Sequence, residues 1–232
     1  MNGPAALPSE WRATLAGLFA VALVGAAAAA LFTMNAGIDV TLSALFTGDD
    51  GRFVLAHHPL FEWINSRTRD AAILASAIAL FGLAFTLVKR RSFWGRSARD
   101  YLFFTLSLAL SAGLVANILL KNQWGRARPR QLVEFGGALH FTPPLSPADQ
   151  CATNCSFVAG DAALVFALVA FALAATWRRP LWIVLTIVSG FLVGLVRIAQ
   201  GAHFASDVVF AFVVVLAIVL LLKLVVVDTR RA

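Results

Sequence analysis

Two sets of residues in the second half of the chain have types and spacings suited to phosphate chemistry. Lys121 is followed seven residues later by Arg128, and Arg197 is followed by His203 and then, four residues further on, by Asp207. A lysine and an arginine can hold phosphoryl oxygens, the arginine through its two-pronged guanidinium. An imidazole can act as a nucleophile when a carboxylate one helical turn away accepts its Nδ1 proton and leaves Nε2 free.

The same residues also allow a purely structural interpretation. On a helix that continues past residue 121, Lys121 and Arg128 would be close to two turns apart and face the same way, until Pro129 interrupts the helix. Cations at helix ends commonly extend toward lipid headgroups, which would explain that pair alone. His203 and Asp207 with an arginine nearby are harder to explain in this way, because ionisable groups at the end of a span need partners. The sequence therefore favours an anion site with a histidine nucleophile.

The composition indicates a helical membrane protein. Of the 232 residues, 60% are hydrophobic and only 13% are charged, which is too apolar for the surface of a water-soluble domain. The apolar residues form runs of about 16 to 20 residues, enough to cross roughly 30 Å of hydrocarbon as helix. We therefore predict an all-α fold with six transmembrane helices, over Leu15–Phe32, Ala71–Val88, Tyr101–Leu120, Ala162–Trp177, Leu181–Val196 and Val208–Val227.

The chain is predicted to form a single six-span domain over residues 1–232. No linker rich in glycine, serine or proline divides it, and no internal repeat is evident. The first apolar run could instead be a cleaved signal peptide, although only Arg12 stands where a basic leader would precede it. In the first outer connection, 33–70, the segment Phe61–Asp70 is predicted to form an interfacial helix.

The basic residues predict the orientation of the helices. They cluster between the second and third spans, between the fourth and fifth, and after the sixth, and such loops stay on the cytoplasmic side. Both termini should then be cytoplasmic. Lys121 and Arg128 fall on the opposite side, against this trend, and an anionic ligand would explain them. The net charge of +7 thus reflects topology and a ligand site rather than a nucleic-acid surface. The clusters are Lys89, Arg90, Arg91, Arg96 and Arg99, then Arg178 and Arg179, then Arg230 and Arg231.

Both cysteines, Cys151 and Cys155, lie in the second long outer connection, 121–157. If that connection faces an oxidising compartment, a disulfide can close a small loop ahead of the fourth span. Free thiols or a metal-binding pair are the alternatives, although no histidine or further cysteine lies nearby at ligand spacing. We predict the disulfide and no metal site.

Three motifs together resemble the signatures of the type-2 phosphatidic acid phosphatase family. Members of that family are six-span, metal-independent lipid phosphatases, related to soluble vanadium haloperoxidases and acid phosphatases. The resemblance covers the second half of the chain, whereas the first two spans match only in number. The segments WGRARP (124–129), EFGG (134–137) and CATNCSF (151–157) are also similar to the bacterial branch that dephosphorylates lipid A or related envelope lipids. The motifs are Lys121-x6-Arg128-Pro129, a glycine motif at Gly160, and Arg197-x5-His203-x3-Asp207.

The resemblance implies a role for each matching residue. His203 would attack phosphorus and become phosphohistidine, with Asp207 orienting it. Three cations would hold the phosphoryl oxygens and neutralise developing charge, namely Lys121, Arg128 and Arg197. Water would then hydrolyse the phosphoenzyme, and no metal or other cofactor would take part.

The middle motif departs from the family pattern, which is usually Pro-Ser-Gly-His and here is Val158-Ala159-Gly160-Asp161. The missing serine removes a hydroxyl donor to phosphate, for which Ser156 is a candidate substitute. Gly160 could present its backbone N–H at the start of the fourth span, where the helix dipole favours an anion. Asp161 takes the place of the usual general acid, and could either act as that acid or simply cap the fourth span.

We therefore expect a lipid phosphatase in the inner membrane of a bacterium, acting at its periplasmic face on a phosphorylated lipid such as lipid A. Undecaprenyl pyrophosphate, phosphatidylglycerophosphate and phosphatidate are alternative substrates, and transfer to an alcohol would make the protein a phosphotransferase. A lipid-phosphate-binding protein that lost turnover through Ala159 and Asp161 is the non-enzymatic alternative. The remaining histidines are not expected to be catalytic: His57, His58 and His140.

Overall fold

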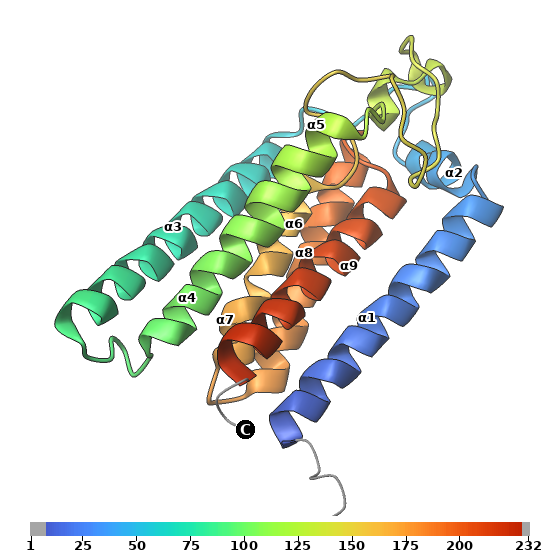
Figure 1. Cartoon of the computed structure of the whole chain (residues 1–232). Coiled ribbons are helices and arrows are strands. Elements are labelled where there is room, and N and C mark those ends of the chain that lie inside the picture. The colour runs from blue at the N-terminus through green and yellow to red at the C-terminus, as the bar shows by residue number, and fades with distance from the viewer. Residues whose placement is uncertain (1–7, 229–232) are drawn as a thin grey trace, which may run out of the picture.

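The computed structural model of the chain describes residues 8–228, and all regular elements within that range are helices. The long helices run side by side as a bundle (Figure 1). The third long helix along the chain is continuous from residue 98 to residue 123 and has three parts, of which the middle one is a π-helix. The long helices are α1 (Ser9–Met34), α3 (Pro59–Lys89), α4 (Ala98–Leu106) with η1 (Ser107–Leu120) and α5 (Lys121–Gln123), α8 (Arg179–Ala199), and α9 (Ala205–Leu222) with η4 (Lys223–Val227).

The predicted all-helical membrane fold is confirmed. Between residues 8 and 228, five helices are long and apolar enough to cross a membrane. The fourth predicted span is shorter than the others, since it consists of α6 (Gly160–Ala167) and α7 (Val169–Ala174), of 8 and 6 residues. α6 lies inside the bundle against η1, α8 and α9. Its alanines at 162, 163 and 167 are fully buried, and such small side chains let neighbouring helices approach closely.

The interfacial helix predicted at Phe61–Asp70 is not a separate element. These residues form the first turns of α3, which runs without a break from Pro59 to Lys89. A proline in the first turn suits the start of a helix because its missing N–H needs no partner there. The first outer connection does contain a short helix, α2 (Ile38–Ala44), but it lies earlier and packs against α9.

The two ends of the bundle carry different chemistry. One end carries α2, α5 and the long connection with the short helices η2 (Pro129–Gln131) and η3 (Val133–Phe135) (Figure 1). The opposite end carries the start of α1 and the basic connections 90–97 and 175–178. There Thr14 of α1 donates a 2.7 Å hydrogen bond to Asp228, which also accepts from Lys223. The third predicted basic cluster, Arg230 and Arg231, lies outside the described residues.

Candidate active site

Lys121 and Gly160 meet where the third long helix passes the start of α6. A Cβ atom on Gly160 would lie 2.8 Å from the Lys121 Nζ and 2.2 Å from the Asn117 Oδ1. A side chain at position 160 would therefore displace the ends of the Asn117 and Lys121 side chains. The ammonium group of Lys121 consequently lies against the amino-terminal end of α6, where backbone N–H groups favour an anion.

His203 lies fully buried in the turn between α8 and α9. Its Nδ1 is 2.7 Å from the carbonyl oxygen of Ser156 and 3.6 Å from Asp207 Oδ2. Because a carbonyl only accepts hydrogen bonds, Nδ1 carries the proton and Nε2 presents a lone pair. Within residues 8–228, Nε2 has no hydrogen-bond partner. The sequence predicted that Asp207 would accept the Nδ1 proton, and this is corrected here: the nearer acceptor is the backbone of Ser156.

The surroundings of His203 keep its ring neutral. Burial lowers the pKa of His203 to about 4, and the positive charges of Lys121 and Arg128 act in the same direction, against the opposing effect of Asp207. A desolvated imidazole disfavours the protonated form. At neutral pH the ring is therefore an uncharged base with a free lone pair, which is the form that a nucleophile requires.

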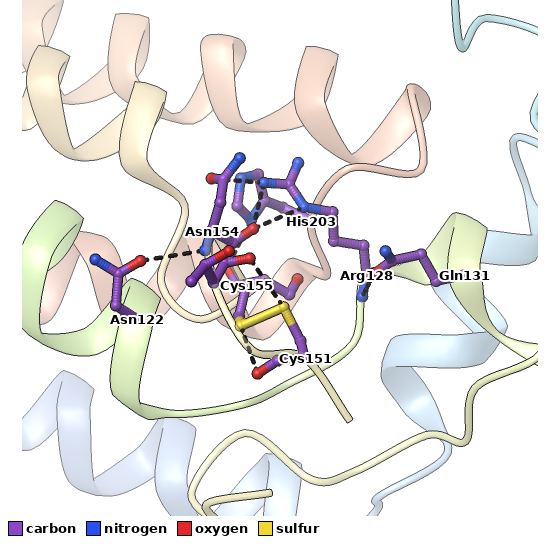
Figure 2. The surroundings of a disulfide bond; sticks show 9 residues. Asn122, Arg128, Gln131, Cys151, Asn154, Cys155 and His203 are labelled. Atoms are coloured by element: carbon purple, nitrogen blue, oxygen red, sulfur yellow. Dashed lines mark hydrogen bonds between the residues drawn. A yellow bond between two sulfur atoms is a disulfide. The ribbon is translucent and has the colours of Figure 1, made fainter. Parts of the chain in front are cut away.

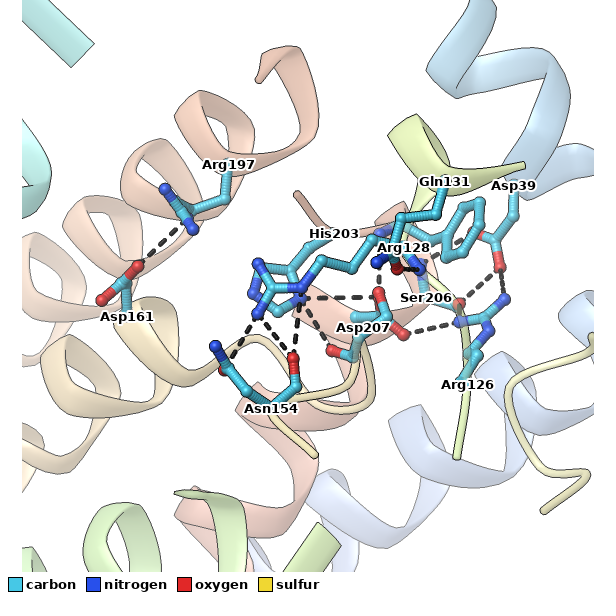
Figure 3. Close-up of polar contacts among 12 residues, drawn as sticks. Asp39, Arg126, Arg128, Gln131, Asn154, Asp161, Arg197, His203, Ser206 and Asp207 are labelled. Carbon is cyan, nitrogen blue, oxygen red and sulfur yellow. Dashed lines mark hydrogen bonds and ion pairs between the residues drawn. The ribbon is translucent and has the colours of Figure 1, made fainter. Parts of the chain in front are cut away.

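Asp207 is held by a buried arginine that the sequence analysis did not assign to the site. Arg126 is fully buried, and its guanidinium bridges the carboxylates of Asp207 and Asp39 (Figure 3). The Arg126 Nη2 lies 2.8 Å from the Asp39 Oδ2. Ser206 joins the same group, donating its hydroxyl to Asp39 and accepting from Arg126. We call Asp39, Arg126, Ser206 and Asp207 the Arg126 network. It fixes the position of the carboxylate beside His203.

The Arg126 network is satisfied on every side. The guanidinium also donates from Nε to the Thr142 carbonyl at 2.9 Å and lies 4.2 Å from the Phe204 ring centroid. Asp207 further accepts from the backbone N–H of Phe204 at 2.8 Å and from the hydroxyl of Ser156. Since the Ser156 hydroxyl is engaged by Asp207, it is not the substitute phosphate donor that the sequence suggested.

Arg128 approaches the site from a turn rather than from a helix. The helix on which Lys121 and Arg128 would face the same way does not reach residue 128, because α5 ends at Gln123 and Gly125 adopts a φ of +68°. A Cβ at Gly125 would lie 1.6 Å from the Ala148 carbonyl oxygen. Arg128 itself is extended, ahead of Pro129. Burial, followed by the charges of Arg130 and Arg197, lowers the pKa of Arg128 to about 10, so its guanidinium remains positively charged at neutral pH.

A disulfide loop lies between the two cations of the first motif. Cys151 and Cys155 are bonded, with their Cα atoms 5.6 Å apart (Figure 2). The backbone N–H of Cys155 donates to the Lys121 carbonyl at 2.8 Å. Within the loop, Asn154 accepts from the Arg128 guanidinium through its carbonyl oxygen at 2.7 Å and its side-chain oxygen at 2.9 Å. The loop thus positions Arg128 through Asn154.

Arg197 and Asp161 form an ion pair at the edge of the site, with Nε 3.0 Å from Oδ2. Arg197 also donates to Gln200, which accepts from Asn65 of α3 at 2.8 Å. Asp161 is the second residue of α6; the residue that precedes the helix is Ala159, and no side chain caps it. The alternative that Asp161 caps the fourth span is therefore not what the structure shows.

The site brings four of the sequence-predicted charged residues near the imidazole of His203. The pKa of His203 responds to Lys121, Arg128 and Asp207, and that of Arg128 to Arg197, which places these charges within electrostatic reach of one another. Three cations beside a neutral nucleophile and a helix amino terminus suit a phosphoryl group, whose equatorial oxygens gain negative charge in transfer. The other three histidines, at positions 57, 58 and 140, are exposed.

The Arg126 network could not be predicted from local patterns in the sequence. Arg126 and Asp39 lie 87 residues apart, on either side of two predicted spans, and no local pattern pairs them. The segment WGRARP gave a partial signal, because it contains both Arg126 and Arg128. Ser156 was noticed, but as a phosphate donor rather than as a partner of both His203 and Asp207.

The helical bundle defines a polytopic membrane protein, in which a buried histidine lies near several cations. Residues 100–231 match the model of the PAP2 superfamily. This match covers more than half of the chain, which therefore belongs to that superfamily, and the family resemblance predicted from the motifs is confirmed.

The similar curated proteins are bacterial. The chain is 43% identical over 110 residues to a lipid A 4'-phosphatase of Francisella tularensis subsp. novicida (strain U112), covering 47% of this chain and 50% of that protein. It is 42% identical over 106 residues to a lipid A 4'-phosphatase of Rhizobium leguminosarum, covering 44% and 45%. The chain thus spans about half the length of the curated relatives it matches. No solved structure matches it.

Proposed function

We propose that the protein is a membrane lipid phosphatase that removes a phosphate from an envelope glycolipid such as lipid A, through a phosphohistidine intermediate. The observation that carries the proposal is the buried Nε2 of neutral His203, near the charges of Lys121 and Arg128, which has no hydrogen-bond partner among residues 8–228. The superfamily and the names of the similar bacterial proteins support a phosphorylated lipid as the substrate.

The first step would form the bond between nitrogen and phosphorus. The Nε2 lone pair of His203 attacks phosphorus while the bond from phosphorus to the lipid oxygen breaks. Lys121, Arg128 and the amino terminus of α6 hold the phosphoryl oxygens. The ring becomes positively charged as phosphohistidine, and Asp207 at 3.6 Å from Nδ1 stabilises that charge while the Ser156 carbonyl retains the Nδ1 proton.

Release of the lipid alcohol requires a proton. Asp161 is the candidate donor, but a carboxylate paired with Arg197 has no proton to give. We propose that the bound phosphate takes over the Arg197 guanidinium, and that Asp161 accepts the proton of a monoanionic phosphate as it is freed. Asp161 then delivers this proton to the leaving oxygen. Arg197 would in this way become the third phosphate-binding cation.

The second step would return the enzyme to its starting state. Water attacks phosphorus, the bond between nitrogen and phosphorus breaks, and its electron pair returns to Nε2 of His203. Asp161 can accept the proton that the water loses. Asp161 then passes this proton to the departing inorganic phosphate, which leaves as the monoanion, and the freed carboxylate pairs with Arg197 again. In this scheme the positive charges come from the three side chains, and no step requires a metal.

We further propose that the site faces the periplasm of a bacterial inner membrane, with both termini in the cytoplasm. The support is that the basic connections 90–97 and 175–178 lie at the end of the bundle opposite His203, and such connections favour the cytoplasmic side. The disulfide beside the site also suits an oxidising compartment.

The proposal is tested by incubating the purified full chain with lipid A, phosphatidate, phosphatidylglycerophosphate and undecaprenyl pyrophosphate, with and without a chelator. We expect release of inorganic phosphate from lipid A that the chelator does not lower. Acid-labile, alkali-stable radiolabel should appear on the protein, be lost in His203→Gln and be kept in His140→Gln, whose histidine is exposed. Faster phosphate release from another lipid would identify that lipid as the substrate. Lower activity with the chelator would overturn the metal-free scheme. Lipid binding without phosphate release would identify a binding protein.

A further inference from the structure

Two adjoining cavities lie in the half of the bundle away from His203. The larger has a volume of about 550 Å³ and lies between α3, α4, α7 and α8. Its walls are almost entirely apolar and include Ile78, Tyr101, Phe104 and Phe171. The smaller, of about 320 Å³, has charged walls. Arg96 and Ala175 line both, so the two cavities adjoin each other, and we call the pair the amphipathic space.

The apolar cavity exists because α7 is short. α7 ends at Ala174, whereas α3 and α8 both continue along the bundle at this end. Of the α7 residues that line the cavity, Phe171 contributes a ring and Ala172 only a methyl group. Two tryptophans stand at its rim, with Trp94 73% and Trp182 43% exposed. Tryptophan prefers the boundary between lipid tails and headgroups, so the cavity opens near that level.

The charged cavity has an excess of positive charge. It is lined by Arg96, Arg179 and Lys223 against the two acids Glu10 and Asp100. Arg179 and Lys223 both pair with Glu10, at 3.2 and 3.4 Å. Among residues 8–228, the guanidinium of Arg96 has neither a hydrogen bond nor an ion pair, although it stands where the two cavities meet.

The connection that carries Arg96 adds to this positive charge. Arg90 and Arg91 lie in the same connection, and Lys89 and Arg99 lie at the adjoining ends of α3 and α4; Lys89, Arg90 and Arg91 are exposed. Basic residues beside a membrane attract anionic lipid headgroups. The amphipathic space therefore has an apolar part beside the lipid tails and, near the level of the headgroups, the guanidinium of Arg96, which has no ion pair among residues 8–228.

We infer that this amphipathic space binds one anionic glycerophospholipid of the leaflet opposite the candidate active site. One acyl chain occupies the apolar cavity between α3 and α8, and the phosphate of the headgroup pairs with Arg96. The site is separate from the one that holds the substrate, and the lipid acts as a structural partner that fills the space left by the short α7. A zwitterionic lipid would fit the apolar cavity but would gain less from the basic connection.

The test measures lipid retention and requires no enzymatic activity, so its outcome is independent of the proposed function. The full chain in detergent is mixed with equal amounts of phosphatidylglycerol and phosphatidylcholine of the same acyl chains, and bound lipid is counted by native mass spectrometry. We expect one phosphatidylglycerol to be retained in preference. Arg96→Gln should lower its retention about fivefold, while Arg91→Gln, which removes an exposed cation from the same connection but from neither cavity, should not.

A second pair of variants tests the acyl compartment. Ala75→Phe projects a ring into the apolar cavity from α3 and should lower retention of both lipids. Ala77→Phe places the same ring on the exposed side of α3, away from both cavities, and serves as its control. Helical content and elution as a single species establish that each variant is folded. Equal retention of the two lipids by the unaltered protein, or equal losses in Arg96→Gln and Arg91→Gln, would overturn the inference.

Discussion

At the scale of single residues, the chemistry of the site depends on which groups hold the imidazole and which hold its carboxylate. The Ser156 carbonyl sets the tautomer of His203, while Arg126 fixes Asp207. Two separate supports therefore position the ring and its counter-charge. Because Asp39 and Ser206 in turn hold Arg126, the geometry at His203 depends on a fully buried group of charged and polar side chains.

Replacing Arg126 with lysine should damage both stability and turnover. Lysine keeps the charge but cannot bridge two carboxylates with a planar fork, and breaking a buried ion pair costs about 3 to 5 kcal/mol. We expect Tm in detergent to fall by about 10 °C and kcat by about 100-fold, since a small displacement of a catalytic group has that effect. The control is Arg130→Lys, at an exposed arginine four residues away. Equal Tm values for the two variants would show that the Arg126 network does not stabilise the fold.

The pH dependence should reveal the buried, neutral state of His203. Because its pKa is lowered to about 4, the ring remains an uncharged nucleophile well below pH 6.5, where an exposed histidine becomes protonated. We expect the histidine-dependent fall in kcat/KM near pH 4 rather than near pH 6.5. Phosphate esters also titrate near pH 6, so two substrates with different phosphate pKa values should be compared. A fall near pH 6.5 that is the same for both substrates would contradict a neutral buried ring.

The same pKa shift predicts the direction of a stability change. Between pH 6.5 and about 4 the unfolded chain binds a proton at His203 that the folded protein does not bind. Unfolding is therefore favoured as pH falls through this window, by an amount on the order of 3 kcal/mol when the window has been crossed. His203→Gln should lack this part of the change in Tm with pH, because glutamine does not titrate. The measurement is Tm of both proteins at pH 7 and pH 4.5.

At the scale of elements, the sequence predicted the spans well and their ends less well. Long apolar runs identify helices because lipid leaves the backbone no other partner. The end of α5 at Gln123 was missed, since the turn at Gly125 is required by contact with Ala148, which is distant in sequence. The short helices α6 and α7 were predicted as a single span, because apolar composition does not show that a segment will be interrupted.

The disulfide loop should act on substrate binding through Arg128. Replacing both Cys151 and Cys155 with serine opens the loop and lowers the free energy of unfolding by about 2 kcal/mol in the usual chain-entropy model. Asn154 then holds the Arg128 guanidinium less firmly. We expect the inhibition constant of inorganic phosphate to rise about fivefold, with a smaller change in kcat. Ala152→Ser, at an exposed position inside the same loop, should change neither. Unchanged phosphate affinity in the double variant would show that the loop does not position Arg128.

At the scale of the whole molecule, the first part of the chain contributes to a site whose motifs all lie in the second. The superfamily model matches residues 100–231, yet Asp39 of α2 holds Arg126, and Asn65 of α3 reaches Arg197 through Gln200. The motif residues could be predicted because their spacing is local. These outer supports could not, since they depend on how the first connection folds across the end of the bundle.

The arrangement of charge over the whole molecule predicts how it sits in the membrane. If the end with His203 faces the periplasm, a cysteine at exposed Ser146 should react with a membrane-impermeant maleimide on intact cells with a permeabilised outer membrane. A cysteine at exposed Ser92, in the basic connection at the opposite end, should react only after the inner membrane is opened. The native cysteines are bonded to each other and give no background. The reverse labelling pattern would place the histidine at the cytoplasmic face, so that the proposed substrate would have to be a lipid of the inner leaflet.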